Sequence, residues 1–229
     1  MDLNTTLDQV VEADFTTFGS LGKAKPIGGV SKRGLDISIA MTALLILAPL
    51  MLVVAFLVWW HDRGHPFFGH TRVGCGGRPF KCLKFRSMVK NAGTVLDEVL
   101  ERDPEAAREW AETQKLRDDP RVTPIGRLLR ITSLDELPQL FNVLSGHMSI
   151  VGPRPIVISE IDRYGQHYHH YSACRPGVTG LWQVSGRSDV DYDKRVNFDV
   201  TYASSWTLWR DAHIIVKTVP IVLNRKGSY

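Results

Sequence analysis

A long, mostly apolar run between residues 37 and 60 constrains the fold of this 229-residue chain more than any other feature. The run carries no charged side chain, and its length suffices to cross a bilayer, whose hydrocarbon core takes about 20 helical residues. It begins too far from the N-terminus for a signal peptide, and it has no small-residue cleavage site. The run therefore predicts a membrane helix.

The charges on both sides of this run bear on its topology. Basic residues flank both ends, and basic flanks favour the cytoplasmic side, so a single straight span satisfies only one of them. Pro49 lies near the middle and is expected to kink a helix. Two readings stay open: a helix that bends at Pro49 and returns to the same face, which the charge symmetry favours, and an ordinary kinked spanning helix. The basic residues are Lys23, Lys25, Lys32 and Arg33 before the run, and Arg63, Arg72, Arg78, Lys81, Lys84 and Arg86 after it.

Composition narrows the classes of partner. A net charge of +4 suits an anionic membrane surface or anionic substrates, but it is too small and too scattered to indicate nucleic acid, which we do not expect as a partner. The cysteines Cys75, Cys82 and Cys174 form no CxxC pattern. We interpret them as free thiols in a reducing compartment, and we expect no zinc site.

The rest of the chain predicts an α+β fold that is mostly helical, with one small β-hairpin. Asp36 stands at helical spacing from Lys32 and Arg33, which predicts ion pairs at the membrane edge. The expected elements are a loose tail over 1–30, a hairpin within 64–88, charged helix over 92–117 broken at Pro104, two short helices over 124–144, a turn-rich loop at 149–155, helix over 156–172, a glycine-rich loop over 175–188 with a strand at 181–184, and helix over 190–223.

Two adjacent carboxylates, Asp135 and Glu136, stand in an otherwise apolar stretch. One reading is a capping box, with Ser133 as the N-cap residue and Glu136 three residues later. That reading explains Glu136 but gives no role to Asp135, which follows closely after Arg130. Charged side chains are rarely buried without a partner, and a helix N-terminus also binds phosphate well. A structural cap and a site for phosphate chemistry therefore both stay open.

Several arginines and one lysine lie beside glycine or proline, or within apolar stretches. Each alone is most often a surface charge, but arginine on a loop is also suited to clamp phosphate oxygens in a bidentate fashion. These residues are Arg72, Lys84, Arg86, Arg130, Arg154, Arg175 and Arg187.

Three other patterns have an ordinary structural reading. The acidic residues Asp189, Asp191 and Asp193 resemble the DxD pattern of metal-dependent glycosyltransferases, but the start of a helix explains them better. The histidines between residues 167 and 170 lack a carboxylate to complete a metal site, which favours a surface or interface position. Trp206 and Trp209 are equally compatible with a membrane-interfacial helix and with packing into the core.

Five motifs follow one another along the chain. They are Lys32-Arg33-x-x-Asp36, Lys84-Phe85-Arg86-Ser87-Met88, Thr132 to Leu140, Ser149 to Pro155, and Pro176 to Arg187. In this order they resemble the motifs of the bacterial sugar transferases, which are monotopic polyprenyl-phosphate phosphoglycosyl transferases. The similarity extends from about residue 31 to the C-terminus, and it is strongest to the branch that initiates exopolysaccharides.

The resemblance implies a role for individual residues. It implies that Asp135 is the nucleophile, that Glu136 is a ligand of Mg²⁺, and that the helix is re-entrant and broken at Pro49. It also implies a nucleotide-sugar site at the Pro-Arg-Pro segment. The candidate substrate-binding residues are Lys84, Arg86, Arg130, Pro153, Arg154, Pro155, Gln183 and Arg187.

The implied reaction transfers galactose-1-phosphate or glucose-1-phosphate from a UDP-sugar to undecaprenyl phosphate, releases UMP and passes through a covalent aspartyl intermediate. The expected place is the cytoplasmic face of the bacterial inner membrane, with membrane lipid and a second copy of the chain as candidate partners. The expected organisation is a flexible tail at 1–30, a re-entrant helix at 31–62, and a cytoplasmic catalytic domain with interfacial helices at 63–229. The alternatives are a non-catalytic membrane scaffold and a DxD glycosyltransferase that releases UDP.

Overall fold

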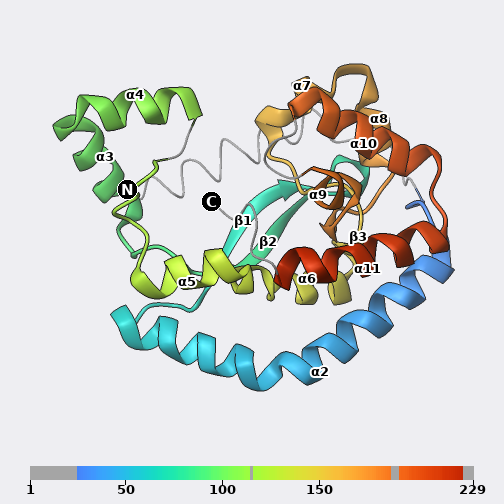
Figure 1. Ribbon diagram of the computed structural model, residues 1–229, viewed down its shortest axis with the longest axis horizontal. Coiled ribbons are helices and arrows are strands. Elements are labelled where there is room, and N and C mark those ends of the chain that lie inside the picture. Colours follow the sequence, from blue (N-terminus) through green and yellow to red (C-terminus); the bar gives the residue numbers. More distant parts are fainter. Residues whose placement is uncertain (1–24, 114–115, 187–190, 224–229) are drawn as a thin grey trace. The chain divides into compact units, whose positions relative to one another are not determined.

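The computed structural model describes residues 25–113, 116–186 and 191–223, and most of these residues are helical, as predicted (Figure 1). Contacts group the described residues into two compact units. Unit 1 comprises residues 25–48, 69–83 and 138–223, and unit 2 comprises residues 49–68 and 84–137. The units divide the chain differently from the predicted tail, membrane helix and catalytic domain, and that organisation stays a prediction.

Helix α2 (Gly29–Asp62) contains the whole apolar run and continues through Pro49 (Figure 1). In the described ranges it is the one helix long and apolar enough to cross a membrane. The boundary between the two units falls at Pro49. Much of the apolar surface of α2 is exposed. The exposed apolar side chains are Ile37, Met41, Leu45, Ile46, Leu50, Leu52, Val53, Phe56, Leu57, Trp59 and Trp60.

The predicted hairpin is confirmed by the pairing of β1 (Phe67–Val73) with β2 (Pro79–Phe85). A short 3₁₀ turn, η1 (Cys75–Gly77), lies between the two strands. Gly76 and Gly77 have φ values of 68° and 75°, in the left-handed region that glycine adopts without steric cost. The glycine cluster that suggested a hairpin in the sequence therefore forms its turn.

The helices of unit 2 begin and end close to the positions that the sequence predicted. Pro104 starts α4 (Pro104–Thr113) directly after α3 (Ala92–Arg102), and these two helices pack together. Helix α5 (Pro124–Thr132) begins with an N-cap, because the Thr123 hydroxyl accepts a 2.9 Å bond from the Gly126 N–H. Gly126 also permits a close backbone approach, since a Cβ there would lie 1.9 Å from the Ser87 carbonyl oxygen.

Unit 1 is built from short elements around a two-stranded parallel sheet. The strands β3 and β4 pair with Ser149 opposite Gly177 and Val151 opposite Thr179. The elements are α6 (Gln139–Ser145), β3 (Ser149–Val151), η3 (Ile158–Glu160), α7 (Ile161–Tyr164), η4 (Gly165–His167), α8 (Tyr168–Ser172), β4 (Gly177–Thr179), α9 (Leu181–Ser185), α10 (Tyr192–Ser204) and α11 (Leu208–Leu223).

The sequence prediction was wrong about the strand in this region. Residues 181–184 lie in helix α9, and the strand is the preceding segment, β4. The start of the predicted 149–155 loop is likewise a strand, β3. Each strand is only three residues long, so neither shows a periodic apolar pattern, and the pairing between them decides their conformation.

The predicted ion pair between Asp36 and Lys32 was wrong, whereas the Asp36 charge still acts on Arg33. The Lys32 ammonium instead donates a 2.6 Å bond to the Asp211 carboxylate, and Arg33 donates to the last carbonyls of α6 at 2.5 and 2.8 Å. The Asp36 carboxylate accepts 2.9 Å bonds from a hydroxyl and a backbone N–H of β3. Lys32 and Asp36 are buried, and a buried charge takes the partner that packing brings to it rather than its neighbour on the helix.

The two tryptophans near the start of α11 differ in environment. Trp206 packs against the core of unit 1, and its indole N–H donates a 3.0 Å bond to Asp211. The side chain of Trp209 is 84% exposed. Each of the two open readings therefore fits one tryptophan: Trp206 lies at the core, and Trp209 is free to meet an interface.

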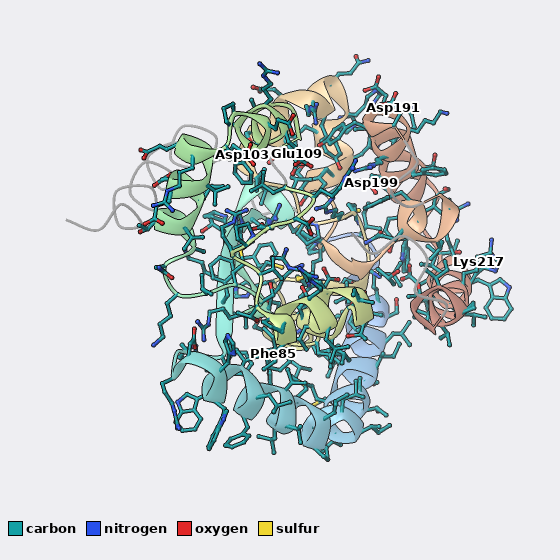
Figure 2. All side chains as sticks on the ribbon, turned by 60° about the vertical axis from the view of Figure 1, so that its left-hand side comes forward. Phe85, Asp103, Glu109, Asp191, Asp199 and Lys217 are labelled. Carbon is teal, nitrogen blue, oxygen red and sulfur yellow. The ribbon has the colours of Figure 1, made fainter. Side chains whose placement is uncertain are left out.

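Asp199 on α10 is a buried carboxyl with an unusual pKa (Figure 2). The Tyr164 hydroxyl donates a 2.7 Å bond to one oxygen, and the other oxygen has no hydrogen-bond partner in the part of the chain that the structure describes. Burial raises the pKa of Asp199 to about 7, although the bond from Tyr164 acts to lower it. The pKa of an aspartate in the unfolded chain is about 3.9. Between about pH 4 and pH 7, the folded state therefore holds a proton on Asp199 that the unfolded state has released.

This pKa predicts that the protein loses stability as the pH rises. The contribution of the protonated Asp199 is complete below about pH 4 and is lost as the pH rises through about 7. We expect the free energy of unfolding to fall between pH 5 and pH 8, and Asp199→Asn to remove most of that fall. Urea unfolding of the detergent-solubilised protein measures it, with the exposed Asp193→Asn on the same helix as control. Equal pH dependence in both variants would contradict the assignment.

Candidate active site

The Asp135–Glu136 pair lies in a 3₁₀ turn, η2 (Leu134–Glu136), and not at the start of an α-helix. Ser133 has φ of 56°, in the left-handed region, and it ends α5; its side chain makes no capping bond. The predicted capping box was therefore wrong, because a left-handed Ser133 ends one helix without offering its hydroxyl to the next turn. Neither carboxylate is committed to a helix cap.

Lys84, at the end of β2, bridges the two carboxylates. Its ammonium nitrogen lies 2.6 Å from an oxygen of Glu136 and 3.6 Å from an oxygen of Asp135. The Asp135 residue is only 8% exposed, whereas the Glu136 side chain is 40% exposed. The three groups form a compact cluster within unit 2, with a buried member and a solvent-facing member.

The environment of Asp135 exerts opposing effects on its acidity. Burial raises the pKa of Asp135, the Lys84 ammonium lowers it, and the neighbouring Glu136 carboxylate raises it further. Arg130 adds a smaller effect that lowers it. Burial is the largest of these effects, so the pKa of Asp135 lies above the usual value for aspartate, and the Lys84 and Arg130 cations limit the rise.

The two nearby arginines have structural partners. The Arg130 Nε–H donates a 2.9 Å bond to the Ser87 hydroxyl, and the Arg86 guanidinium donates two 2.5 Å bonds to the Asp62 carboxylate. Sequence reasoning missed both partners, because they lie far from the arginines along the chain. Ser87 does belong to one of the family motifs, Lys84 to Met88. A substrate-binding role for either arginine stays a prediction.

In unit 1 the structure brings two of the motif segments together. The Gly152 N–H donates a 2.9 Å bond to the Thr179 carbonyl, and the Gly177 N–H donates a 2.7 Å bond to the Pro153 carbonyl. Only glycine fits at 152, since a Cβ would lie 2.3 Å from the Arg175 carbonyl oxygen. The Pro-Arg-Pro segment therefore runs beside the segment that leads into α9.

Trp182 on α9 lies close to two arginines of unit 1, of which Arg154 is a predicted substrate residue. The guanidinium carbons of Arg154 and Arg195 lie 6.0 and 4.9 Å from the centre of its ring. The neighbouring Gln183 has a buried side-chain oxygen without a hydrogen-bond partner in the described ranges. An unpaired buried acceptor is costly unless a ligand satisfies it, which agrees with a binding role for Gln183. Arg187 lies outside the described residues.

A buried tyrosine fixes the backbone next to the Pro-Arg-Pro segment. The Tyr171 hydroxyl accepts a 3.2 Å bond from the Ile156 N–H and donates a 2.7 Å bond to the Val73 carbonyl. Pro155 is held as well, since its carbonyl accepts a 3.4 Å bond from Arg72. Sequence reasoning did not single out Tyr171, because nothing in the pattern of the 156–172 helix separates it from its neighbouring tyrosines.

The predicted helix start at the DxD pattern is confirmed for Asp191. Its carboxylate accepts a 2.7 Å bond from the Tyr192 N–H, and it stands at the first turn of α10 (Figure 2). Asp189 lies outside the described residues. Asp191 thus has a capping role that needs no metal.

Comparison with known proteins decides the family. The family model described as bacterial sugar transferase matches residues 27–225, which is most of the chain. The chain belongs to the bacterial sugar transferase family. The resemblance recognised from the motifs is confirmed.

Curated relatives place the chain in the exopolysaccharide branch of this bacterial sugar transferase family. The exopolysaccharide production protein ExoY of Sinorhizobium fredii is 52% identical over 91% of this chain and 92% of its own length. The undecaprenyl-phosphate galactose phosphotransferase of Salmonella typhimurium is 54% identical over 86% of this chain and 41% of its own length. The UDP-glucose:undecaprenyl-phosphate glucose-1-phosphate transferase of Escherichia coli is 40% identical over 89% of this chain. The chain spans less than half the length of these last two relatives.

Proposed function

We propose that this bacterial sugar transferase is an enzyme that moves a hexose-1-phosphate from a UDP-sugar to undecaprenyl phosphate and releases UMP. The names of relatives that are 40–54% identical support the class of reaction. The observation that carries the mechanism is a buried Asp135 beside Lys84, with no capping duty. In this role the protein starts an exopolysaccharide on the membrane, with galactose or glucose as the sugar.

The proposed reaction has two displacement steps at one phosphorus. An Asp135 oxygen attacks the β-phosphorus of the UDP-sugar, the bond to the bridging oxygen breaks, and UMP leaves with that oxygen. An oxygen of undecaprenyl phosphate then attacks the same phosphorus and frees the carboxylate, which yields undecaprenyl diphosphate sugar. Lys84 supports the ionised nucleophile and, together with Arg130, screens the repulsion between carboxylate and phosphate.

The chemistry of the dyad fits Mg²⁺. This ion typically takes one or two protein carboxylates together with substrate phosphates, rather than a complete protein cage. Glu136 provides a partly exposed carboxylate next to Asp135, and one of its oxygens accepts a 2.6 Å bond from the Lys84 ammonium. We propose Glu136 as the residue that would hold Mg²⁺, which would supply positive charge to the diphosphate when bound.

Glu136→Gln is expected to lower activity mainly by weakening metal binding. The amide keeps the shape of the side chain but loses its charge, so the residual rate should need a much higher Mg²⁺ concentration. Rates measured across a magnesium titration give the half-saturating concentration. The matched control is Glu105→Gln, on the exposed start of α4. An unchanged magnesium requirement in folded Glu136→Gln enzyme would argue against Glu136 as the ligand.

We also propose that α2 is re-entrant, on the cytoplasmic face of the inner membrane, where UDP-sugars are found. Its first turn is tied to unit 1 through Lys32 and Asp211, and its last residue, Asp62, is tied to unit 2 through Arg86. Basic residues flank both ends of the apolar run, and basic flanks favour the cytoplasmic side, so both ends of α2 belong on one side.

Exposed apolar side chains outside α2 suit contact with the membrane surface. Leu128 and Ile131 are exposed on α5, and Trp209, Val216 and Val219 are exposed on α11. Short helices with one exposed apolar face and a polar remainder lie in the plane of the interface. These two helices are our candidates for the interfacial helices, with membrane lipid as their partner. A homodimer stays a prediction.

The re-entrant topology predicts that the N-terminal end of α2 stays inside the cell. Val30 is 90% exposed, so a cysteine there reports accessibility without disturbing packing. In a background without Cys75, Cys82 and Cys174, Val30→Cys should resist a membrane-impermeant maleimide until the cells are permeabilised. Adding Pro49→Ala should move a fraction of the chains to a spanning form that is labelled from outside. Labelling of Val30→Cys in intact cells without the Pro49 change would show a spanning helix.

The function itself is tested by the product and the released nucleotide. Purified protein in nanodiscs is supplied with undecaprenyl phosphate, Mg²⁺ and radiolabelled UDP-galactose or UDP-glucose. We expect a labelled lipid diphosphate sugar and UMP from one of the two donors. A DxD glycosyltransferase would instead release UDP, and a scaffold would form no lipid product.

A further inference from the structure

A cavity of about 520 Å³ lies within unit 1, beside the turn of the β1–β2 hairpin. The residues just before α2, the turn η1, the end of α6 and the residue before Pro176 line it. Neither the dyad nor the Pro-Arg-Pro segment takes part in it. The side chains used below are Lys25, Cys75, Arg78, Phe80, His147 and Arg175.

The lining of this cavity carries positive charge without a matching negative charge. Lys25, Arg78 and Arg175 all line it, and no aspartate or glutamate of the described chain does. The Arg175 guanidinium donates a 3.0 Å bond to the Gly146 carbonyl, which orients it but does not neutralise it. Three cations in a concave site raise the local concentration of anions.

Two of these cations converge on one side chain of the cavity. Burial raises the pKa of the Cys75 thiol, while Arg175 and Arg78 both act to lower it. Both guanidinium groups are therefore within electrostatic reach of the same sulfur atom. The ring of His147 stacks on Phe80, with centroids 5.9 Å apart, and this pair closes part of the wall.

We propose that this cavity binds a phosphate-type anion, with Lys25, Arg78 and Arg175 as its charge partners. Its volume is within the range of small-molecule sites, about 300–1,000 Å³, and leaves room for more than a single phosphate group. Arginine pairs with phosphate oxygens through two parallel bonds, which suits a diphosphate or a phosphorylated headgroup.

This site is separate from the proposed catalytic cluster. Arg78 precedes β2, and Lys84 lies near its other end. Two sources of the anion fit the chemistry. Lys25 lies shortly before α2 (Gly29–Asp62), which we propose enters the membrane, so an anionic lipid headgroup is one source; a soluble diphosphate is the other. Only the lipid source rests on the proposed function; the anion site itself does not, and Asp135→Asn should retain it.

Cys75 offers a local readout of occupancy, because it lines the cavity and is half-buried, while Cys82 and Cys174 are buried. The rate of its modification by uncharged N-ethylmaleimide is measured on the full chain in nanodiscs, in EDTA and at constant ionic strength set by sodium chloride. One arm adds sodium pyrophosphate to phosphatidylcholine nanodiscs. The other arm replaces part of the phosphatidylcholine with phosphatidylglycerol and adds no soluble anion.

We expect saturable slowing of Cys75 modification in at least one arm. Slowing by pyrophosphate identifies a soluble ligand class, and slowing by phosphatidylglycerol identifies a lipid headgroup. Arg78→Gln and Lys25→Gln should each raise the half-saturating concentration about tenfold, whereas Arg108→Gln, exposed on α4, should leave it unchanged. The proposal is overturned if neither arm slows the reaction, or if the slowing is the same in Arg78→Gln as in the native chain.

Discussion

Asp135→Asn is expected to abolish sugar-phosphate transfer while the protein stays folded and membrane-bound. The amide is nearly the same size as the carboxylate but cannot displace UMP from phosphorus, so turnover should fall by about three orders of magnitude or more. The change also removes a charge that burial disfavours, and the Lys84 ammonium keeps its 2.6 Å bond to Glu136. We therefore expect little loss of stability.

Two measurements separate a nucleophile from a merely structural carboxylate. Native enzyme given UDP-sugar and Mg²⁺ without lipid acceptor should gain the mass of one sugar phosphate, and Asp135→Asn should gain none. The matched control is Asp191→Asn, which removes one charge and keeps the helix cap, since asparagine caps as well as aspartate. Asp191→Asn should stay active. Substantial turnover by purified Asp135→Asn would exclude Asp135 as the nucleophile.

Long or locally punctuated features of the fold could be predicted from the sequence. The apolar run predicted α2 because its length and composition allow few other structures. Pro104 divided α3 from α4 because proline is favoured at the first position of a helix, where its missing N–H costs nothing. The hairpin turn followed from its glycines. Short elements could not be predicted from the sequence. Residues 177–179, for example, form a strand because β3 lies beside them.

The candidate site was likewise predictable where it depends on local sequence and unpredictable where it depends on packing. The adjacent charges of Asp135 and Glu136 in an apolar stretch marked the site, since such a pair requires an explanation. The sequence could not show that Lys84 bridges them, because a partner from β2 is brought there by the folded chain. The capping box failed for a related reason: the left-handed backbone of Ser133 is not encoded in any local pattern. Pairings across many residues are properties of packing.

Lys32→Met is expected to give the largest loss of stability outside the catalytic cluster. The side chains of Lys32 and Asp211 are 5% and 1% exposed, and their 2.6 Å ion pair joins α2 to α11. Removing one partner leaves a buried carboxylate without a counter-charge, which costs about 3–5 kcal/mol. The Tyr202 hydroxyl and the Trp206 indole still donate to Asp211, but neither carries charge.

A double variant tests whether the loss comes from the stranded charge. Lys32→Met combined with Asp211→Asn removes both charges. The amide oxygen can accept from Trp206, and the amide NH2 can donate to the Tyr202 hydroxyl, which keeps the Val151 carbonyl as its own acceptor, so the double variant should recover most of the stability. The control is Lys217→Met, on the exposed face of α11, where a change within about 0.5 kcal/mol is expected (Figure 2). Urea unfolding of the solubilised protein gives each free energy. If the double variant is no more stable than Lys32→Met, charge pairing is not the cause.

Lys32→Arg distinguishes the two roles that this lysine can have. As a cytoplasmic flank of a membrane helix, Lys32 needs only its positive charge, and arginine would replace it without loss. As one half of a buried pair, it must fit a site shaped for a slender ammonium, and the planar guanidinium is larger and needs more acceptors. Because Lys32 is 4% exposed, we expect Lys32→Arg to keep the topology in the accessibility assay while lowering the free energy of unfolding. Full stability in Lys32→Arg would show that a positive charge at this position is sufficient, whatever the shape of the side chain that carries it.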